Sequence, residues 1–132
     1  MEKLSNPKKT IEVIQKYQFD FQKKFGQNFL IDGRVLEKIM DAADIGAEDF
    51  VLEIGPGIGT MTQYLAERAR QVMAVEIDRN LIPILSETLS DYDNVEILNA
   101  DILKIDLRKT VEEKNQVGGQ AVLGRQLELP TP

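Results

Sequence analysis

Three glycines at alternate positions mark the junction between a short apolar run and a helical pattern. The run covers residues 50–54, Phe-Val-Leu-Glu-Ile, and its length is typical of a strand that is buried on both faces. Gly55, Gly57 and Gly59 follow at once, and a helical pattern begins at Thr60. Because glycine lets the backbone turn sharply, this string predicts a strand, a tight turn and a helix in direct succession.

The same order of strand and helix continues along the chain. Residues 72–77 and 95–98 form two further apolar runs, and residues 80–89 carry a helical pattern between them. Pro83 falls in the first turn of that helix, where a proline is tolerated. Alternating strands and helices predict an α/β fold with a parallel sheet of about three strands and right-handed crossovers.

Both ends of the chain differ from this middle part. Residues 5–7, Ser-Asn-Pro, are typical of a helix start, and a second helix is expected between Asp32 and Gly46. Residues 115–132 lack a clear period and end in Leu-Pro-Thr-Pro. We therefore expect this last stretch to be a loop or a disordered tail.

The absence of two residue types excludes several kinds of chemistry. The 132 residues contain no cysteine and no histidine. Disulfide frameworks, cysteine nucleophiles, histidine-ligated metals and serine–histidine catalysis are therefore excluded, and we expect no metal site. No apolar run is long enough to span a membrane, and residues 1–9 are too polar for a signal peptide. We therefore expect a cytoplasmic protein that does not contact a membrane.

The charge of the chain is unevenly distributed. Sixteen basic and 22 acidic side chains give a net charge of -6, which disfavours a protein that binds nucleic acid by charge alone. Residues 1–24 hold six lysines and three acids and so carry +3, which leaves -9 for the remainder. This segment is either a solvated arm or a basic face that could meet a polyanion.

The spacing of the glycines separates this turn from two well-known nucleotide-binding loops. No Gly-Lys-Ser or Gly-Lys-Thr string follows, as a phosphate-binding loop requires. The third glycine also comes one position too early for the dinucleotide fingerprint, and Glu53 is a further difference. Taken alone, the string also fits an ordinary strand–helix turn that binds nothing.

Two acidic residues strengthen the prediction of a ligand site at the glycine turn. Glu76 lies near the end of the second expected strand, and Asp101 lies at the end of the third. Ligands of open parallel sheets bind outside these carboxyl ends. A carboxylate at Glu76 can accept hydrogen bonds from both hydroxyls of a ribose, and one at Asp101 can accept from the amino group of adenine. The three strand ends together predict a pocket for S-adenosylmethionine, whose sulfonium charge suits an acidic site.

Four strings carry a resemblance to a known family. They are Lys-Lys-Phe-Gly-Gln-Asn-Phe-Leu-Ile-Asp at 23–32, Glu-Ile-Gly-Pro-Gly-Ile-Gly at 53–59, Val-Glu-Ile-Asp at 75–78 and Asn-Ala-Asp-Ile-Leu at 99–103. From about Lys16 to Asp106 the chain closely resembles the ribosomal-RNA adenine dimethyltransferases. Macrolide-resistance methyltransferases share Gln-Asn-Phe-Leu but usually differ where Pro56 and Ile58 stand, which favours the housekeeping enzyme of small-subunit ribosomal RNA.

The resemblance implies a Rossmann-like sheet that binds S-adenosylmethionine and acts on small-subunit ribosomal RNA. Residues 1–31 would form a helix and arm over the cofactor site, residues 32–114 a partial methyltransferase domain, and residues 115–132 an atypical tail. By resemblance, the methionine end of the cofactor would contact Asn28 and Leu30, and the loop beside it would be lined by Gly55 and Gly57. Ribose would be bound by Glu76 and adenine by Asp101.

One family motif is missing from the sequence. The Asn-Leu-Pro-Tyr-type string, which in the family holds the target adenine, does not occur, and the family pattern ends near Lys114. We therefore expect a truncated or frame-disrupted copy, assign no catalytic residue and expect no methyl transfer by this chain alone. Two other functions remain open, a non-catalytic cofactor-binding fragment and an RNA-binding remnant that uses the basic arm.

In the family, the missing motif ends the fourth strand of the sheet, so we expect that strand to be absent here. Without a fourth strand, the apolar strand 50–54 would present an unpaired edge, which is a template for pairing with another chain. We expect either self-association through this edge or its coverage by part of residues 115–132.

Overall fold

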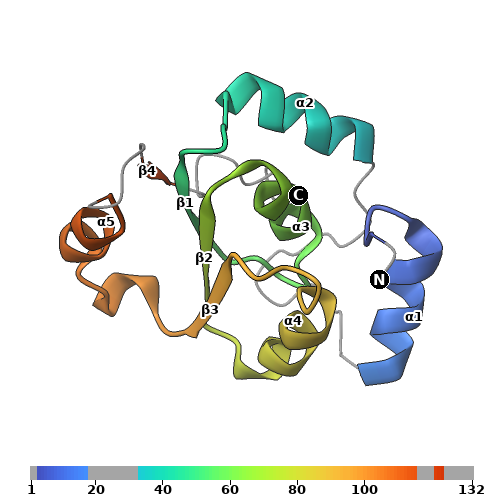
Figure 1. Ribbon diagram of the computed structural model, residues 1–132. Helices are drawn as coiled ribbons and strands as arrows, with labels where there is room; N and C mark the ends of the chain where they lie inside the picture. The colour runs from blue at the N-terminus through green and yellow to red at the C-terminus, as the bar shows by residue number, and fades with distance from the viewer. Residues whose placement is uncertain (1–2, 18–32, 116–120, 124–132) are drawn as a thin grey trace.

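The computed structural model describes residues 3–17, 33–115 and 121–123 (Figure 1). A parallel sheet with strand order β3-β2-β1-β4 lies at its centre. Its strands are β1 (Phe50–Ile54), β2 (Gln71–Glu76), β3 (Val95–Asn99) and β4 (Ala121–Leu123). The three strands expected from the apolar runs are confirmed, within one residue at each end.

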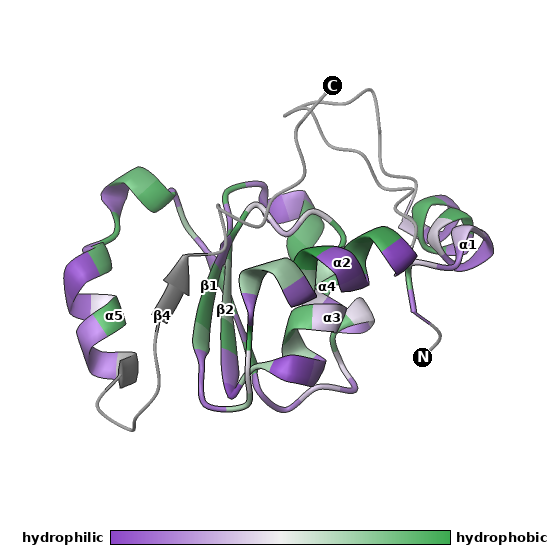
Figure 2. Ribbon diagram, turned by 90° about the horizontal axis from the view of Figure 1, so that it is seen from above, coloured by the Kyte–Doolittle hydropathy of each residue, from purple (hydrophilic) through white to green (hydrophobic). Residues whose placement is uncertain are grey.

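The helices cover the sheet on two sides. Figure 2 shows α2 (Gly33–Ala43), α3 (Thr60–Arg68) and α4 (Ile82–Thr88) on one side, and α5 (Leu107–Asn115) on the other. Side chains alternate between the faces, as the pleat requires. Val51 and Val72 belong to the core under α2 and α3, whereas Phe50 and Leu52 belong to the core on the α5 side.

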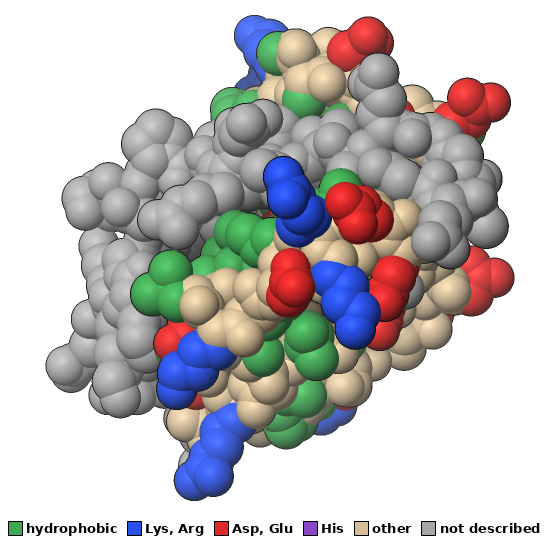
Figure 3. Space-filling model, turned by 90° about the vertical axis from the view of Figure 1, so that its left-hand side faces the viewer, with side chains coloured by type: hydrophobic (Ala, Val, Ile, Leu, Met, Phe, Trp, Pro, Cys, Tyr) green, Lys and Arg blue, Asp and Glu red, His purple; other side chains and the backbone are tan. Residues whose placement is uncertain are grey.

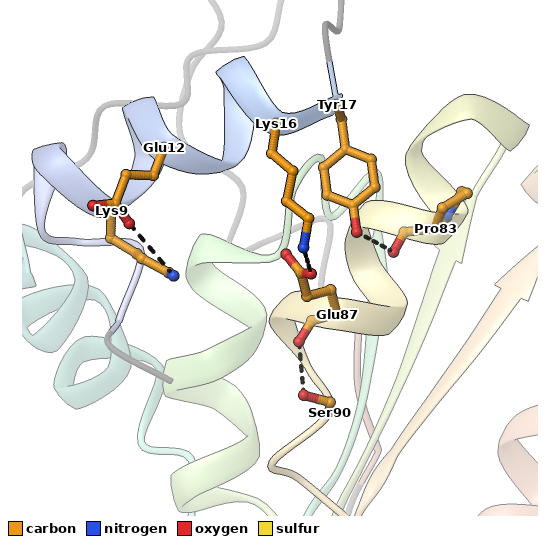
Figure 4. Close-up of polar contacts among 7 residues, drawn as sticks. All are labelled: Lys9, Glu12, Lys16, Tyr17, Pro83, Glu87 and Ser90. Atoms are coloured by element: carbon orange, nitrogen blue, oxygen red, sulfur yellow. Dashed lines mark hydrogen bonds and ion pairs between the residues drawn. The ribbon is translucent and has the colours of Figure 1, made fainter.

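Helix α1 (Pro7–Tyr17) packs beside α4 rather than on the sheet. It begins as expected, with proline in its first turn and the Asn6 side chain accepting a hydrogen bond from the Lys8 N–H at 3.1 Å. At its other end, the Tyr17 hydroxyl donates to the Pro83 carbonyl at 3.5 Å, and Lys16 pairs with Glu87 (Figure 4).

The helices differ from the sequence prediction in two places. The second helix ends at Ala43, not at Gly46, because Asp44 adopts a left-handed conformation with φ of 53°. Helix α5 was not expected. Its sequence, Leu-Arg-Lys-Thr-Val-Glu-Glu-Lys-Asn, has few apolar residues, so the apolar periodicity that predicts a helix is weak.

The expected loop or disordered tail is also wrong in part. Residues 121–123 pair in parallel with Phe50, Val51 and Leu52 of β1 and form β4. The physical reason is the edge itself, because the unpaired donors and acceptors of β1 are satisfied by any short extended segment nearby. The second of the two expected outcomes for this edge, coverage by part of the tail, is the one in the structure.

The described residues hold no helix that is both long and apolar enough to cross a membrane.

Candidate functional site

The turn after β1 requires all three of its glycines. Gly55, Gly57 and Gly59 have φ of 71°, 63° and 98°, a region that other residues rarely adopt. The turn starts from the sheet, since the Gly55 N–H donates to the Val75 carbonyl of β2 at 2.9 Å. It ends at the start of α3, where the Gly59 N–H donates to the Pro56 carbonyl at 3.0 Å. The backbone is therefore fixed in a tight loop at the carboxyl edge of the sheet.

Glu76 is the last residue of β2, and its carboxylate meets this loop. One carboxylate oxygen accepts from the Gly57 N–H at 3.3 Å, and the other accepts from the Asp78 N–H at 2.9 Å. The residue is only 2% exposed. Burial raises the pKa of the Glu76 carboxyl above its usual range, and the backbone hydrogen bonds counteract part of that rise. The structure thus joins Gly57 and Glu76, two of the residues singled out in the sequence.

Asp101 lies two residues beyond the end of β3, and the two residues before it are joined to Glu76. The connection runs through the backbone: the Ala100 N–H donates to the Glu76 carbonyl at 3.1 Å, and the Asn99 side chain donates to the same carbonyl at 2.8 Å. One Asp101 carboxylate oxygen accepts from the Leu103 N–H at 2.9 Å and so caps a short 3-10 helix. Asp101 is half-buried, whereas Glu76 is buried.

Ile77 is a residue of this edge that the sequence analysis did not single out. It follows Glu76 directly, and 56% of it is exposed, which is high for a large apolar side chain next to a buried strand. Its backbone is held by the Asn99 side chain, which donates to the Ile77 carbonyl at 3.3 Å. Its position in the sequence could have identified it as a site residue, because an apolar residue just past the carboxyl end of a strand lies at the edge where ligands bind.

Glu53 belongs to the packing between layers rather than to this edge. It is 2% exposed and accepts a hydrogen bond from the Thr62 hydroxyl of α3. Asn28 and Leu30 lie outside the described residues. Among the residues that the structure describes, no group of three or more acidic, histidine or cysteine side chains could hold a metal ion.

Three of the four lysines in the described part of residues 1–24 pair with carboxylates. Lys3 lies 2.6 Å from the carboxylate of Glu67, Lys16 pairs with Glu87, and Lys9 pairs with Glu12 at 3.6 Å. On the α5 side, acidic and basic side chains are interspersed (Figure 3). In the N-terminal segment, the three ion pairs reduce the positive charge that its described part offers to a polyanion.

The sequence matches a family model described as ribosomal RNA adenine dimethylase over residues 18–124. It is 66% identical over 120 residues to the ribosomal RNA small subunit methyltransferase A of Lachnoclostridium phytofermentans. That match covers 90% of this chain and 41% of the relative. The chain thus spans about two fifths of the length of the curated relatives it matches.

Solved structures agree with these sequence matches. The 23S rRNA methyltransferase ErmE shares 45% identity and a TM-score of 0.55, over 59% of this chain and 32% of that one. A coclaurine N-methyltransferase solved with S-adenosylhomocysteine shares 26% identity and a TM-score of 0.50, over 56% of this chain and 23% of that one. The expected Rossmann-like methyltransferase fold is confirmed.

Proposed function

Since the chain belongs to the ribosomal RNA adenine dimethylase family, we propose that it forms the S-adenosylmethionine-binding part of an enzyme that dimethylates adjacent adenines of small-subunit ribosomal RNA. The observation that carries the proposal is the contact between the Gly57 N–H and the buried Glu76 carboxylate. It unites a loop that permits close backbone approach with an acceptor for ribose hydroxyls, at the edge where ligands of parallel sheets bind.

Three side chains at this edge fit the adenosine part of the cofactor. The Glu76 carboxylate would accept hydrogen bonds from the two ribose hydroxyls, and the exposed side chain of Ile77 would offer an apolar surface to the adenine ring. Asp101 would accept a hydrogen bond from the adenine amino group. A ligand that brings two hydroxyl donors to Glu76 would also compensate for the burial that raises its pKa.

The remaining parts of the cofactor site are assigned through the family. Gly55 and Gly57 would line the loop beside the cofactor, where a Cβ would require a strained backbone. Asn28 and Leu30 would contact the methionine end. The excess of acidic side chains outside the N-terminal segment favours a cofactor that carries a positive sulfonium.

The chemistry of the proposed enzyme is methyl transfer to an exocyclic amine. S-adenosylmethionine supplies the activated methyl group, and the residues of this chain bind and orient it, so their contribution is positioning. No described residue is assigned a catalytic role. Because the sequence contains no Asn-Leu-Pro-Tyr string to hold the target adenine, we propose that these 132 residues bind the cofactor without methylating RNA themselves.

A titration with S-adenosylmethionine tests the proposal. Glu76→Gln keeps the shape of the side chain but removes its charge, and we expect binding to weaken about tenfold, as for a lost charged hydrogen bond. Asp101→Asn should have a smaller effect, because the residue is more exposed. The control is Asp93→Asn, an exposed carboxylate before the amino end of β3, away from the site. Binding that is unchanged in a folded Glu76→Gln variant would contradict the proposal.

The two other functions are tested in the same series. A non-catalytic cofactor-binding fragment would bind S-adenosylmethionine and leave unmethylated small ribosomal subunits unmodified. An RNA-binding remnant would bind a ribosomal RNA fragment without cofactor. We expect this last binding to be weak, because Lys3, Lys9 and Lys16 are paired with carboxylates.

A further inference from the structure

A chain of buried hydrogen bonds connects α1 with the glycine loop. The Thr10 hydroxyl donates to the Leu4 carbonyl at 2.6 Å, and the Leu4 N–H donates to Gln63 Oε1 at 2.9 Å. The Gln63 amide donates in turn to the Thr88 carbonyl at 2.9 Å, and the Thr88 hydroxyl donates to the Ile58 carbonyl at 2.7 Å. None of these five residues is more than 1% exposed.

The polar groups of this chain are surrounded by apolar side chains. Leu4 and Ile58 belong to one core cluster with residues of α1 and α4. A buried hydroxyl or amide without a partner is costly, so each of these groups depends on its neighbour in the chain. Gln63 uses both ends of its amide, one toward the N-terminal segment and one toward α4. Such a connected arrangement fixes the relative positions of α1, α3, α4 and the loop.

The last bond of the chain acts on the loop itself. The peptide between Ile58 and Gly59 is held on both sides, because its carbonyl accepts from Thr88 and its N–H donates to the Pro56 carbonyl. The fit is close: a Cβ at Gly59 would lie 2.9 Å from the Thr88 hydroxyl oxygen. Gly57, the residue before Ile58, donates to Glu76. The carbonyl that Thr88 holds is therefore one residue away from the N–H that meets the proposed ribose-binding carboxylate.

We propose that Thr88 and Gln63 are positioning residues for the S-adenosylmethionine site, and that residues 3–10 help to set the geometry of the glycine loop through them. This inference rests on the proposed function. Neither residue belongs to the cofactor contacts proposed above. Their effect on binding would come from holding the Ile58–Gly59 peptide, and with it the Gly57 N–H, in the orientation that meets Glu76.

The test measures S-adenosylmethionine binding and thermal stability of the full chain and its variants at a temperature where all are folded. Thr88→Val keeps the shape but removes the hydroxyl, and we expect the dissociation constant to rise about tenfold. Thr88→Ser restores the donor and should bind within about twofold of the wild type. The control is Ser90→Ala. The Ser90 hydroxyl donates to the Glu87 carbonyl just after α4 and does not belong to the buried series of hydrogen bonds (Figure 4).

A variant that destabilises the molecule elsewhere distinguishes a positioning role of Thr88 from a general effect on stability. Met40→Ala creates a cavity in the core under α2, so it should lower the melting temperature while binding at the lower temperature stays unchanged. If Thr88→Val does not fold, Thr10→Val tests the other end of the hydrogen-bond series, and we expect its dissociation constant to rise about threefold. Binding equal to that of the wild type in the folded variants would overturn the inference and leave the proposed function intact. No binding by the wild type would instead contradict the proposed function.

Discussion

Strands β1 and β2 are buried along nearly their whole length, whereas no residue of β3 is fully buried. The first two strands lie between two cores, one under α2 and α3 and one on the α5 side. Strand β3 lies at the edge of the sheet and has a neighbour on one side only. The two regions therefore differ in how many layers hold each backbone segment in place.

The candidate site spans both regions. The glycine loop and Glu76 extend from the buried pair, and the loop is packed at Ile58 against residues of α1 and α4. Asp101 extends from the exposed strand and is oriented by a local cap on Leu103. This difference indicates that the proposed ribose end of the site is set by the core, whereas the proposed adenine end is set by a few local hydrogen bonds.

The largest expected effect compares a fully buried core residue with a half-buried one. Leu85 is fully buried beside the glycine loop, and Leu85→Ala should lower the free energy of unfolding by about 2–5 kcal/mol. Ile105, half-buried on the α5 side, should cost roughly half as much when changed to alanine. Urea unfolding measures both, and equal losses would contradict the expectation that burial sets the cost of each substitution.

A second comparison uses two glycines. Gly59→Ala forces a side chain into a left-handed backbone with its Cβ 2.9 Å from the Thr88 hydroxyl, so we expect a loss of about 1–3 kcal/mol. Gly46 is the matched control, because a Cβ there would meet only the Asp49 carboxylate at 3.8 Å. Gly46→Ala should change the free energy of unfolding by less than about 0.5 kcal/mol. Comparable losses in the two variants would show that the loop is less constrained than its geometry indicates.

Acid should affect binding and stability in opposite directions at the buried end of the site. Because burial raises the pKa of Glu76 in the folded chain, protonation begins above the pH range usual for a glutamate. As the pH falls through that raised pKa, the proposed acceptor for the ribose of S-adenosylmethionine loses its charge, so we expect binding to weaken. Over the same window, the contribution of Glu76 to the free energy of unfolding increases, since the buried charge is removed.

Glu76→Gln provides the control for this pH dependence. Its binding should be weak at every pH, and the acid-dependent part of the affinity seen in the wild type should disappear. An affinity of the wild type that stays constant until the ordinary range of a glutamate is reached would argue against the buried environment of Glu76.

The last comparison concerns β4, where we expect only a small effect on stability. Val122→Pro is incompatible with the interior of a strand pair, yet only three residues are affected, so we expect a loss below about 1 kcal/mol. The exposed edge of β1 should then promote self-association at micromolar concentration. Sedimentation velocity together with hydrogen exchange at residues 50–52 measures this, with Val122→Ala as the control. A variant that stays monomeric with unprotected β1 amides would contradict the prediction.

The order of the elements from α1 to β3 could be predicted because each signal is local. The apolar runs, the glycines and the caps lie within a few residues of the structures they specify, which is why β1, β2, β3 and the turn at 55–59 were predicted nearly to the residue. The family strings identified the same region as a methyltransferase. Glu76 and Asp101 could be placed at one edge because parallel strands end on the same side of a sheet.

Other features depend on partners far apart in the chain, and only the tertiary structure decided them. Strand β4 forms because an unpaired edge lies nearby, although Ala-Val-Leu has no strand pattern of its own. Gln63 and Thr88 look like ordinary polar residues of two helices, and their connection to Leu4 and Ile58 arises only when α1, α3 and α4 pack together. The sequence determines where the chain turns, and packing determines which buried polar groups meet, because burial makes each of them depend on a partner that only the folded molecule provides.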